Sequence, residues 1–483
     1  MRNGIAEDGK ELFRHRSVAL LKKLHYYINI NFLSKRNYFM KIVIIGGSAA
    51  GMSTAAKARR TDKEAEIIVF ESSEIISFGA CGLPYFVGGF FSDAALMQAR
   101  TVEQMRNSGV DVRIKHRVRS VDTAVKELVV ENLANGEQFI QCYDKLMIAT
   151  GATVIKPSFY DKAHSNVFTL TKMEDGKRLK EIAAREEVRD VTIIGGGFIG
   201  IEVVEAMKNL GKHVRLIQRS GRIFNRMYDE RITDLMQEEM LSHGVELVLN
   251  EAIEALEGEE EVSVVRTEKQ CYQTDLVVIA TGFRPHTDFL KGTEVERLSN
   301  GAVIVNHKGE TTVPDVYAAG DCAAIPHMLT GKNVYVPLAT GANKLGRVVG
   351  INMAGGDARY TGTLASSCVK VLDYEASRSG IDEKDAEEMG LDAVSVFITD
   401  KDQTHYYPGQ EDIHVKLLYD KKSKVVLGGE ILGRSGAAKR IDVIAMAVKT
   451  GMTTEELGMM DFCYAPPFSK TWDVLNVAGN AAK

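Results

Sequence analysis

Residues 41–51 read KIVIIGGSAAG, and this stretch decides the fold. The apolar run at its start is typical of a parallel β-strand that is covered on both faces. Glycines at positions 46, 47 and 51 let the backbone approach a pyrophosphate, which then lies at the N-terminus of the following helix. Ser48 stands where the usual GxGxxG pattern has its middle glycine. The stretch therefore predicts a dinucleotide-binding turn between a strand and a helix.

A second strand after this turn supports the interpretation. Residues 65–70 read AEIIVF and end at Glu71, which lies 20 residues after Gly51. An acid at about that distance is where a ribose hydroxyl finds its acceptor. The alternative is a glycine-rich turn that binds no ligand. The predicted cofactor contacts of this first unit are Gly46, Gly47, Ser48, Ala49, Gly51 and Glu71.

The pattern recurs later in the chain. Residues 191–200 read VTIIGGGFIG and satisfy GxGxxG in full. After the next strand, Gln218 stands where an NAD-preferring site has an acid, and Arg219 follows it. Loss of the acid removes repulsion against a 2′-phosphate, and an arginine attracts one, so we expect NADPH, with NADH still possible. The alternative for Arg219 is a solvated surface charge. The predicted contacts are Gly195, Gly197, Gly200, Arg219 and Arg222.

Two nucleotide turns in one chain suggest one bound flavin and one exchanging nicotinamide. Residues 146–151 read LMIATG and residues 278–285 read VIATGFRP, which are matched strand-to-turn segments where the chain crosses between two nucleotide domains. Residues 311–321 form a short strand that ends at a carboxylate, Asp321. The crossings add Ala149, Thr150, Gly151 and Gly282 to the predicted cofactor contacts.

In these five ordered motifs the chain resembles the FAD-dependent pyridine nucleotide–disulfide reductases. In that superfamily such an aspartate accepts a hydrogen bond from the ribityl chain of the flavin, and Asp321 matches it. The resemblance implies an α/β fold with two Rossmann-like dinucleotide-binding domains, one for FAD and one for NADPH. It also implies an α+β dimerisation domain at the C-terminus.

Residues 77–85 read SFGACGLPY and carry Cys81. Glutathione-reductase-like members of the superfamily have a CxxxxC pair there, whereas this chain has Ile76 and Phe86 five residues to either side. The redox partner of Cys81 must therefore come from elsewhere, as a sulfenate oxygen or as a small thiol. A thiolate is the reactive form, and a helix N-terminus with an oxidised flavin nearby would lower the pKa of Cys81. The alternative is a buried, inert cysteine. The cysteines interpreted as structural are Cys142, Cys271, Cys322, Cys368 and Cys463.

The same segment resembles the coenzyme A disulfide reductases, and the likeness runs from Met40 to the C-terminus. Residues 464–469 read YAPPFS and resemble the segment that reaches the partner subunit's active site in that family. Residues 439–444 resemble its dimerisation domain. Single-cysteine NADH oxidases and peroxidases have a histidine inside the first glycine turn, where this chain has Ala49. The resemblance implies a homodimer and coenzyme A as substrate or bound thiol.

Site residues are implied by position in this resemblance. The substrate contacts fall on Ser53, Lys57, Arg60, Ser77, Phe78 and Asn343, and the two tyrosines over the cysteine fall on Tyr406 and Tyr464. Ala80 stands where some members have asparagine, which puts one polar contact to the pantetheine in doubt. The alternatives are a solvated helix face for Lys57 and Arg60 and a packed loop aromatic for Tyr406.

These features predict a flavoenzyme that reduces coenzyme A disulfide to two thiols through a Cys81–CoA mixed disulfide. Tyr464 of the partner subunit would protonate the departing thiolate. Three alternatives remain open. One is a polysulfide or persulfide reductase that uses bound CoA, and another is an NADH oxidase that cycles Cys81 through sulfenate. The third is a flavin-binding interaction protein that needs no cysteine.

The motifs also predict a domain layout. It comprises an FAD domain split between 40–150 and 280–355, an NAD(P)H domain at 151–279 and a dimerisation domain at 360–483. Residues 1–39 are interpreted as an extension that is not part of the fold, with Met40 as the native start. A targeting sequence is the alternative for these residues.

Composition narrows the class of partner. The formal net charge is −5, which does not favour a nucleic-acid partner. No apolar stretch approaches the length of a membrane span, so we expect no membrane partner. The 6 cysteines show no metal-ligand spacing, so no metal site is predicted. Sparse cysteines without a secretion signal suggest a cytoplasmic protein.

Overall fold

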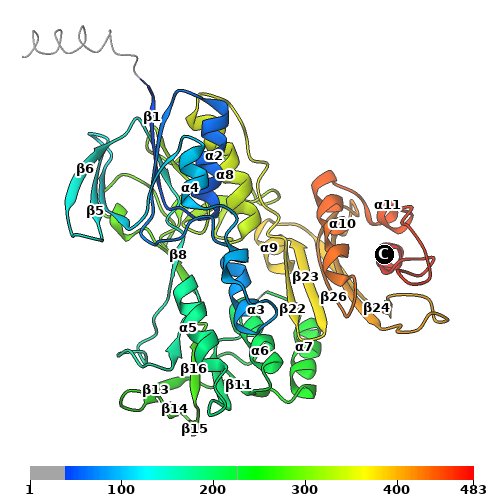
Figure 1. Cartoon of the computed structure of the whole chain (residues 1–483). Helices are drawn as coiled ribbons and strands as arrows, with labels where there is room; N and C mark the ends of the chain where they lie inside the picture. The colour runs from blue at the N-terminus through cyan, green and yellow to red at the C-terminus, as the bar shows by residue number, and fades with distance from the viewer. Residues whose placement is uncertain (1–38, 226) are drawn as a thin grey trace, which may run out of the picture.

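The structure is a computed structural model, and it describes residues 39–225 and 227–483. The interpretation of residues 1–38 as an extension lies outside the described residues. Figure 1 shows three lobes, each built on one of the larger sheets. Within the described part of the chain, no helix is both long and apolar enough to cross a bilayer.

The first lobe is built on a parallel five-stranded sheet. Its order is β19-β7-β1-β2-β3, which places the strand before the first glycine turn in the middle. Helices α2 (Ala49–Thr61) and α8 (Ala339–Met353) pack side by side, because Gly346 and Gly350 leave room for the backbone of α2. The strands are β1 (Lys41–Ile45), β2 (Glu66–Phe70), β3 (Asp111–Arg113), β7 (Lys145–Ile148) and β19 (Val316–Ala318).

Smaller elements surround this sheet. Two of them, η1 and α3, carry the cysteine segment and follow β2 directly. The short helices are η1 (Ala80–Gly82), α3 (Leu83–Val87), η2 (Ala94–Met97), α4 (Val102–Asn107) and η3 (Asp288–Leu290). Two small sheets consist of β4 (His116–Asp122), β5 (Glu127–Asn132) and β6 (Gln138–Cys142), and of β18 (Val303–Ile304), β20 (Ala323–Pro326) and β21 (Asn333–Val334).

The second lobe repeats the plan of the first. Its parallel sheet has the order β12-β11-β10-β16-β9, so the strand before the second glycine turn is again central. The strands are β9 (Val167–Phe168), β10 (Asp190–Ile194), β11 (His213–Gln218), β12 (Glu246–Leu249) and β16 (Leu276–Ile279). The helices are α5 (Met173–Ala183), α6 (Phe198–Asn209) and α7 (Glu230–Ser242), and an antiparallel sheet holds β13 (Ile253–Glu257), β14 (Val264–Thr267) and β15 (Cys271–Gln273).

Two antiparallel strands mark the crossings between these lobes. β8 (Ala152–Val154), which directly follows the first predicted crossing segment, pairs with β17 (Phe283–Pro285), which forms the end of the second. The hydroxyl of Thr150 donates to the carbonyl of His286 at 2.7 Å, and that of Thr281 donates to Ile155 at 3.0 Å. The two crossings are therefore held together by matching contacts.

The third lobe is antiparallel. Its sheet has the order β22-β23-β26-β25-β24, and α10 packs across it. The strands are β22 (Ser367–Val371), β23 (Tyr374–Gly380), β24 (Ala393–Lys401), β25 (Asp412–Asp420) and β26 (Val426–Gly433). The helices are α9 (Glu383–Glu388), α10 (Ala437–Thr450), α11 (Thr454–Gly458) and α12 (Val474–Ala481).

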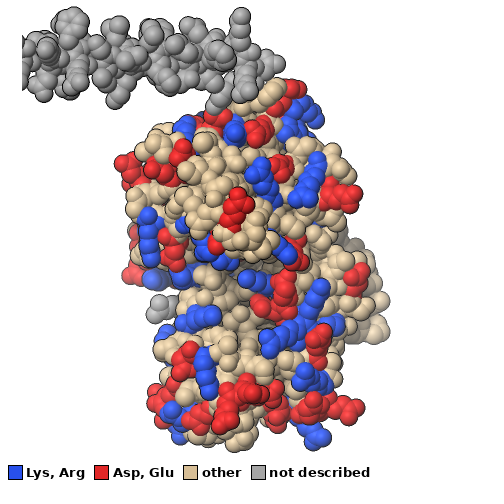
Figure 2. All heavy atoms as spheres, turned by 60° about the vertical axis from the view of Figure 1, so that its left-hand side comes forward, with Lys and Arg blue, Asp and Glu red and all other residues tan. Residues whose placement is uncertain are grey.

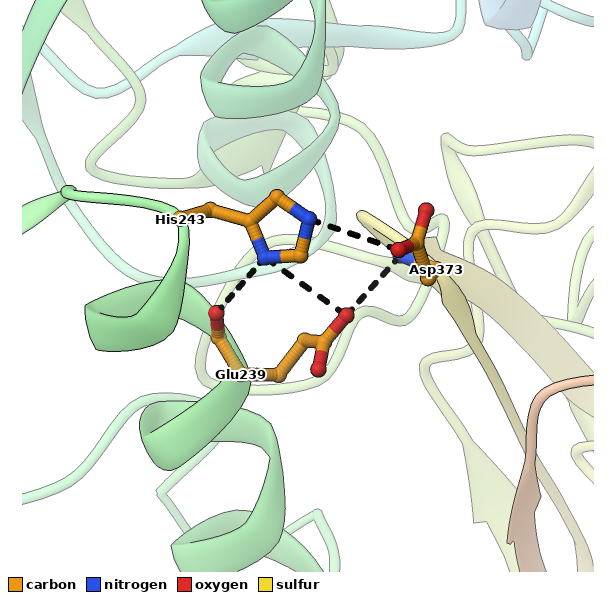
Figure 3. Close-up of side chains that lie close together, drawn as sticks. All are labelled: Glu239, His243 and Asp373. Carbon is orange, nitrogen blue, oxygen red and sulfur yellow. Dashed lines mark hydrogen bonds and ion pairs between the residues drawn. The ribbon is translucent and has the colours of Figure 1, made fainter. Parts of the chain in front are cut away.

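Ion pairs join the second lobe to the third. Figure 3 shows Glu239 and His243, at the end of α7, facing Asp373 in the turn before β23. The imidazole Nε2 of His243 lies 3.4 Å from Asp373 Oδ2. Glu239, His243 and Asp373 together form a group of side chains that could hold a metal ion. Arg434, however, already neutralises Glu239 at 3.0 Å, so we interpret the cluster as a joint between lobes. Further pairs at this seam are Lys370–Glu205 at 2.6 Å and Lys416–Asp229 at 3.2 Å.

Candidate active site

A cavity of about 1950 Å³ is lined by residues of all three lobes. Its wall includes the first glycine turn, Cys81, Glu202 of α6 and Asp321. On the face drawn in Figure 2, acidic and basic side chains are mixed, without a broad region of either charge. Cys81 therefore shares one cavity with part of each predicted nucleotide site, whereas Gly195, Gly200, Arg219 and Arg222 lie outside its wall.

The first glycine turn is set by backbone sterics. Gly46 has a φ of +108°, and a Cβ at this position would lie 2.2 Å from the carbonyl oxygen of Ala149. A Cβ on Gly51 would lie 1.9 Å from the carbonyl oxygen of Gly46. The N–H of Gly47 donates to Glu71 at 2.7 Å, so the acid that ends β2 lies directly against the turn. The residues predicted to contact a pyrophosphate and a ribose thus lie next to each other.

The second glycine turn has nearly the same geometry. Gly195 has a φ of +109°, and a Cβ there would lie 2.5 Å from the carbonyl oxygen of Ala280. A Cβ on Gly200 would lie 1.9 Å from the carbonyl oxygen of Gly195. The N–H of Gly196 donates to the side-chain oxygen of Gln218 at 3.0 Å. Gln218 therefore stands where Glu71 stands in the first turn.

The two arginines predicted beside the second turn have different surroundings. Arg222 donates to the hydroxyl of Thr233 at 3.0 Å and forms an ion pair with Asp234. Arg219 is exposed and makes no hydrogen bond or ion pair with the described residues. Arg219 is therefore available to a phosphate, whereas Arg222 is held within its own domain.

Asp321 is an acceptor that fits a flavin. Its carboxylate lines the cavity and accepts no hydrogen bond from the described residues. Burial raises the pKa of Asp321, because the charged form is poorly solvated there. A half-buried carboxylate without a donor is costly unless a ligand supplies one. The ribityl hydroxyls of FAD would supply such donors, and the cradle at Gly46 would receive its pyrophosphate.

Cys81 lies in η1, directly before α3, and is exposed to the cavity. The protein groups around Cys81 act against the lowering of its pKa that a helix N-terminus and an oxidised flavin were expected to cause. Burial among the cavity walls raises the pKa of the Cys81 thiol most, and the carboxylates of Glu202 and Asp321 raise it further. These effects outweigh a backbone hydrogen bond that favours the thiolate.

Two residues of this cavity region were not predicted from the sequence. Glu202 lies in the first half of α6, and burial, followed by the charge of Glu205, raises its pKa to about 7. Tyr85 lies in α3, and burial and then Glu202 raise the pKa of its hydroxyl. Two acids three residues apart in an otherwise apolar helix were a signal that could have identified Glu202.

The remaining cysteines differ in exposure. Cys322 is fully buried, and burial raises the pKa of its thiol to about 11. Cys368, at the start of β22, is exposed and lines the same cavity as Cys81. The other exposed cysteines are Cys142, Cys271 and Cys463. Among the cysteines interpreted as structural, Cys368 therefore offers a matched thiol for comparison with Cys81.

Several predicted substrate positions come together. The hydroxyl of Ser53 on α2 donates to the side chain of Asn343 on α8 at 2.7 Å. Ser77 has a left-handed φ of +51°, uncommon for a residue other than glycine, and its N–H donates to Gly47 at 2.8 Å. Phe78 and Arg60 also line the cavity, whereas Lys57 lies beside Gly350 of α8 and outside the wall.

The two predicted tyrosines lie on the third lobe, away from the cavity of their own chain. The hydroxyls of Tyr406 and Tyr464 are 2.9 Å apart, and the residues are 63% and 44% exposed. The hydrogen bond with Tyr406 raises the pKa of Tyr464. Phe468 and Trp472, which follow Tyr464 in the chain, are also exposed.

Comparison with known proteins places both halves of the chain. Pyridine nucleotide-disulphide oxidoreductase matches residues 40–346, and the dimerisation domain of the same proteins matches residues 366–475. The solved structure of reduced Bacillus anthracis CoADR-RHD superposes with a TM-score of 0.88 and 34% identity, covering 93% of this chain and 81% of that one. The predicted fold class, two Rossmann-like domains with a C-terminal dimerisation domain, is confirmed.

Curated relatives span nearly the full length of their own chains. The NAD(P)H coenzyme A polysulfide/persulfide reductase of Pyrococcus horikoshii is 37% identical over 447 residues, covering 92% of this chain and 99% of the relative. An NADH oxidase of Enterococcus faecalis and a coenzyme A disulfide reductase of Staphylococcus aureus are each 32% identical over 445 residues. Each of these matches covers 92% of this chain, and 99% and 100% of the two relatives, respectively. With two glycine turns, paired crossings and a dimerisation domain, the chain belongs to the pyridine nucleotide-disulphide oxidoreductase family.

Proposed function

We propose that the protein is an FAD-dependent NAD(P)H:disulfide oxidoreductase that reduces coenzyme A disulfide to two CoA thiols. The observation that carries this proposal is the position of Cys81. It is exposed in the cavity that also reaches the first glycine turn, the second glycine turn and Asp321. Its family and its relatives support the reaction class.

Cys81 supplies the nucleophile. Its thiolate attacks one sulfur of the CoA disulfide, forms a Cys81–CoA mixed disulfide and releases the first CoA thiolate. When bound, FAD would accept a hydride from NAD(P)H and supply two electrons to the mixed disulfide. Those electrons break the sulfur–sulfur bond, which restores the Cys81 thiolate and releases the second CoA. Two protons complete the two thiols, and the nicotinamide leaves oxidised.

The residues around Cys81 would orient the substrate. The Ser53–Asn343 pair and Arg60 line the same cavity as Cys81, where Arg60 could bind a CoA phosphate. Ser77 and Phe78, which precede Cys81 in the chain, also line this cavity. Ala80 provides no polar contact to the pantetheine, so this part of the substrate would be held by its backbone and apolar neighbours.

The active site would be completed by a second chain. The match to the dimerisation domain supports a homodimer. Because Tyr406 and Tyr464 face outward from their own chain, we assign them to the cysteine of the partner subunit. Tyr464 would protonate the departing CoA thiolate, and Tyr406 would hold its hydroxyl by the hydrogen bond between them.

The finer assignments follow from the same layout. We assign FAD to residues 40–150 and 280–355, NAD(P)H to residues 151–279 and dimerisation to residues 360–483. NADPH is the preferred donor, because Gln218 carries no charge and Arg219 is free to meet a 2′-phosphate. A cytoplasmic location fits a reaction that needs reduced nicotinamide and unpaired cysteines.

A second function is favoured by the names of several relatives. The Pyrococcus horikoshii protein, at 37% identity, is named for polysulfide and persulfide reduction with CoA. In that reaction Cys81 would carry the same mixed disulfide, and CoA would remain bound. Oxygen reduction through a Cys81 sulfenate is less well supported, because Ala49 offers no base inside the first turn.

A Cys81→Ser variant tests the proposal, with Cys368→Ser as the matched control from the same cavity. Cys81→Ser should abolish NADPH-dependent reduction of CoA disulfide while FAD stays bound and reducible by NADPH. Cys368→Ser should keep most of the activity. Peptide mass spectrometry should place a reductant-sensitive CoA adduct on Cys81. Normal turnover of CoA disulfide by Cys81→Ser would disprove the mechanism. Much faster reduction of polysulfide than of CoA disulfide by the wild-type protein would change only the substrate assignment.

A further inference from the structure

The cysteine segment lies at the boundary between two apolar cores. Ile76, just before it, is buried in the core of the first lobe. Leu83 and Phe86, just after it, are buried in the core of the second lobe, together with Leu179 and Val204. Figure 1 accordingly shows α3 lying between the first sheet and helices α5 and α6. The helix that follows Cys81 is thus held by the nicotinamide-side domain rather than by its own.

Helix α5 contacts the first turn of α3 at a glycine. A Cβ on Gly176 would lie 2.5 Å from Leu83 Cδ2, and Leu83 is fully buried. Glycine destabilises a helix interior relative to alanine, so a glycine in α5 indicates a close approach that a side chain would prevent. The notch at Gly176 therefore receives Leu83, which lies two residues after Cys81.

The same face of α5 holds the other end of α3. Lys180 lies one helical turn after Gly176, and its Nζ donates to the carbonyls of Phe86 at 2.5 Å and Phe91 at 3.2 Å. The ammonium group also lies 4.2 Å from the ring centroid of Phe86. Because cations interact favourably with the carbonyls at a helix C-terminus, Lys180 fixes the end of α3.

Helix α6 supplies a third contact. The side-chain amide of Asn209 donates to the carbonyl of Gly88 at 2.7 Å. Gly88 packs against α6 so closely that a Cβ would lie 2.8 Å from Ala206 Cα. The segment after Cys81 is therefore held at both ends by the helices that flank the second glycine turn.

We propose that Gly176 and Lys180 are positioning residues for Cys81, so that the NAD(P)H domain sets the place of the thiol that meets the disulfide. The inference rests on the proposed role of Cys81. A displacement of about 1 Å at a reacting atom can slow a reaction by about 100-fold. Neither residue belongs to a glycine turn, so their loss should spare flavin reduction and impair the thiol step.

The test uses the full chain loaded with FAD, and it compares Lys180→Met with Lys177→Met. Lys177 lies on the exposed face of the same helix and is the matched control. Rapid mixing should show that NADPH reduces the flavin in Lys180→Met within about twofold of wild type. Reoxidation by CoA disulfide should be slower by about tenfold or more. Lys180→Arg should restore most of this rate, because arginine can donate to the same carbonyls.

A second readout needs no disulfide substrate. The pH dependence of Cys81 alkylation by iodoacetamide should move to lower pH in Lys180→Met, because a released thiol leaves the walls and the Glu202 carboxylate that raise its pKa. Lys177→Met should match wild type. This arm tests the positioning even where CoA disulfide proves not to be the substrate, a failure that wild-type rates with CoA disulfide and polysulfide would reveal separately. An alkylation profile unchanged from wild type would overturn the proposal.

The Gly176→Ala variant controls for the possibility that Lys180→Met loses activity only because it folds poorly. Alanine favours the helix, and its Cβ would meet only the end of the Leu83 side chain, so thermal stability should fall only slightly if Leu83 shifts. The shift of Leu83 should nevertheless slow reoxidation while flavin reduction stays normal. Equal slowing of both half-reactions in Gly176→Ala and Lys180→Met would show that these contacts only stabilise the domain interface. Reoxidation at the wild-type rate in both variants would also overturn the proposal.

Discussion

The two glycine turns of this chain share a backbone and differ in the side chains around it. Gly46 and Gly195 have φ values of +108° and +109°, and the next N–H donates to the residue that ends the second strand of its sheet. That residue is Glu71 in the first turn and Gln218 in the second. Backbone sterics thus fix the cradle in both turns, whereas a single polar side chain distinguishes the nucleotide that each would bind.

A second difference lies two residues after the last glycine of each turn. In the first turn this residue is Ser53, which donates to Asn343 on the neighbouring helix. In the second turn it is Glu202, a half-buried acid that acts on the pKa of Cys81. Equivalent positions of the two turns therefore carry a predicted substrate contact in one turn and an acid that raises the pKa of Cys81 in the other.

The largest effects are expected when a side chain is introduced at the first glycine of either turn. Gly46→Ala puts a Cβ against a backbone carbonyl at a positive φ, so we expect loss of FAD and poor yield of folded protein. Gly195→Ala makes the same collision in the other turn, and we expect a yellow protein whose KM for NADPH rises at least about tenfold. Flavin absorbance and steady-state kinetics measure both effects. Equal FAD loss in the two variants would show that the turns are not specialised.

The next largest effect concerns the choice between NADPH and NADH, which we assign to the charge of Arg219. Arg219→Ala should raise the KM for NADPH by about 10- to 150-fold and that for NADH little, because a charge-assisted phosphate contact contributes about 1.5–3 kcal/mol. Arg222→Ala should mainly lower thermal stability, because Arg222 pairs with Asp234. Kinetics with both nicotinamides and a melting curve separate the two arginines. Parallel effects on NADPH and NADH in Arg219→Ala would contradict the assignment.

The smallest effect concerns the acid after the second turn. The Glu202 carboxylate raises the pKa of Cys81, so Glu202→Gln should let the thiolate form at lower pH. The effect of Glu202 itself should appear as wild-type protein passes a pH of about 7, where its carboxyl loses its proton. Alkylation of Cys81 against pH measures the shift, and Glu205→Gln, one turn further along α6, should change it less. A profile that moves to higher pH would refute this electrostatic account.

Much of the fold could be predicted from the sequence, because its determinants are local. A buried strand followed by glycines at fixed spacing leaves few backbone solutions, and both turns were placed at Gly46 and Gly195 on this basis. Charge effects were harder to predict. The raised pKa of Cys81 depends on Glu202 and Asp321, which are distant in sequence and meet only in the cavity.

The contact between α3 and α5 could not be predicted either. The sequence around Gly176 gives no sign of its partner, because Leu83, which packs against it, is far away in the sequence. Likewise, Arg219 and Arg222 are equivalent in the sequence, and only the ion pair with Asp234 separates them. The spacing of residues in the sequence therefore predicts the glycine turns, whereas contacts between residues distant in the sequence are seen only in the folded structure.

The outward-facing pair Tyr406 and Tyr464 has a consequence for enzyme assays. If Tyr464 serves the neighbouring chain, the specific activity is a property of the pair of chains and depends on protein concentration by mass action. Dilution below the dissociation constant of the dimer should then abolish disulfide reduction at Cys81, while each chain keeps its flavin. Mixed dimers that combine Cys81→Ser in one chain with Tyr464→Phe in the other should retain one intact site, formed by residues of two different variants.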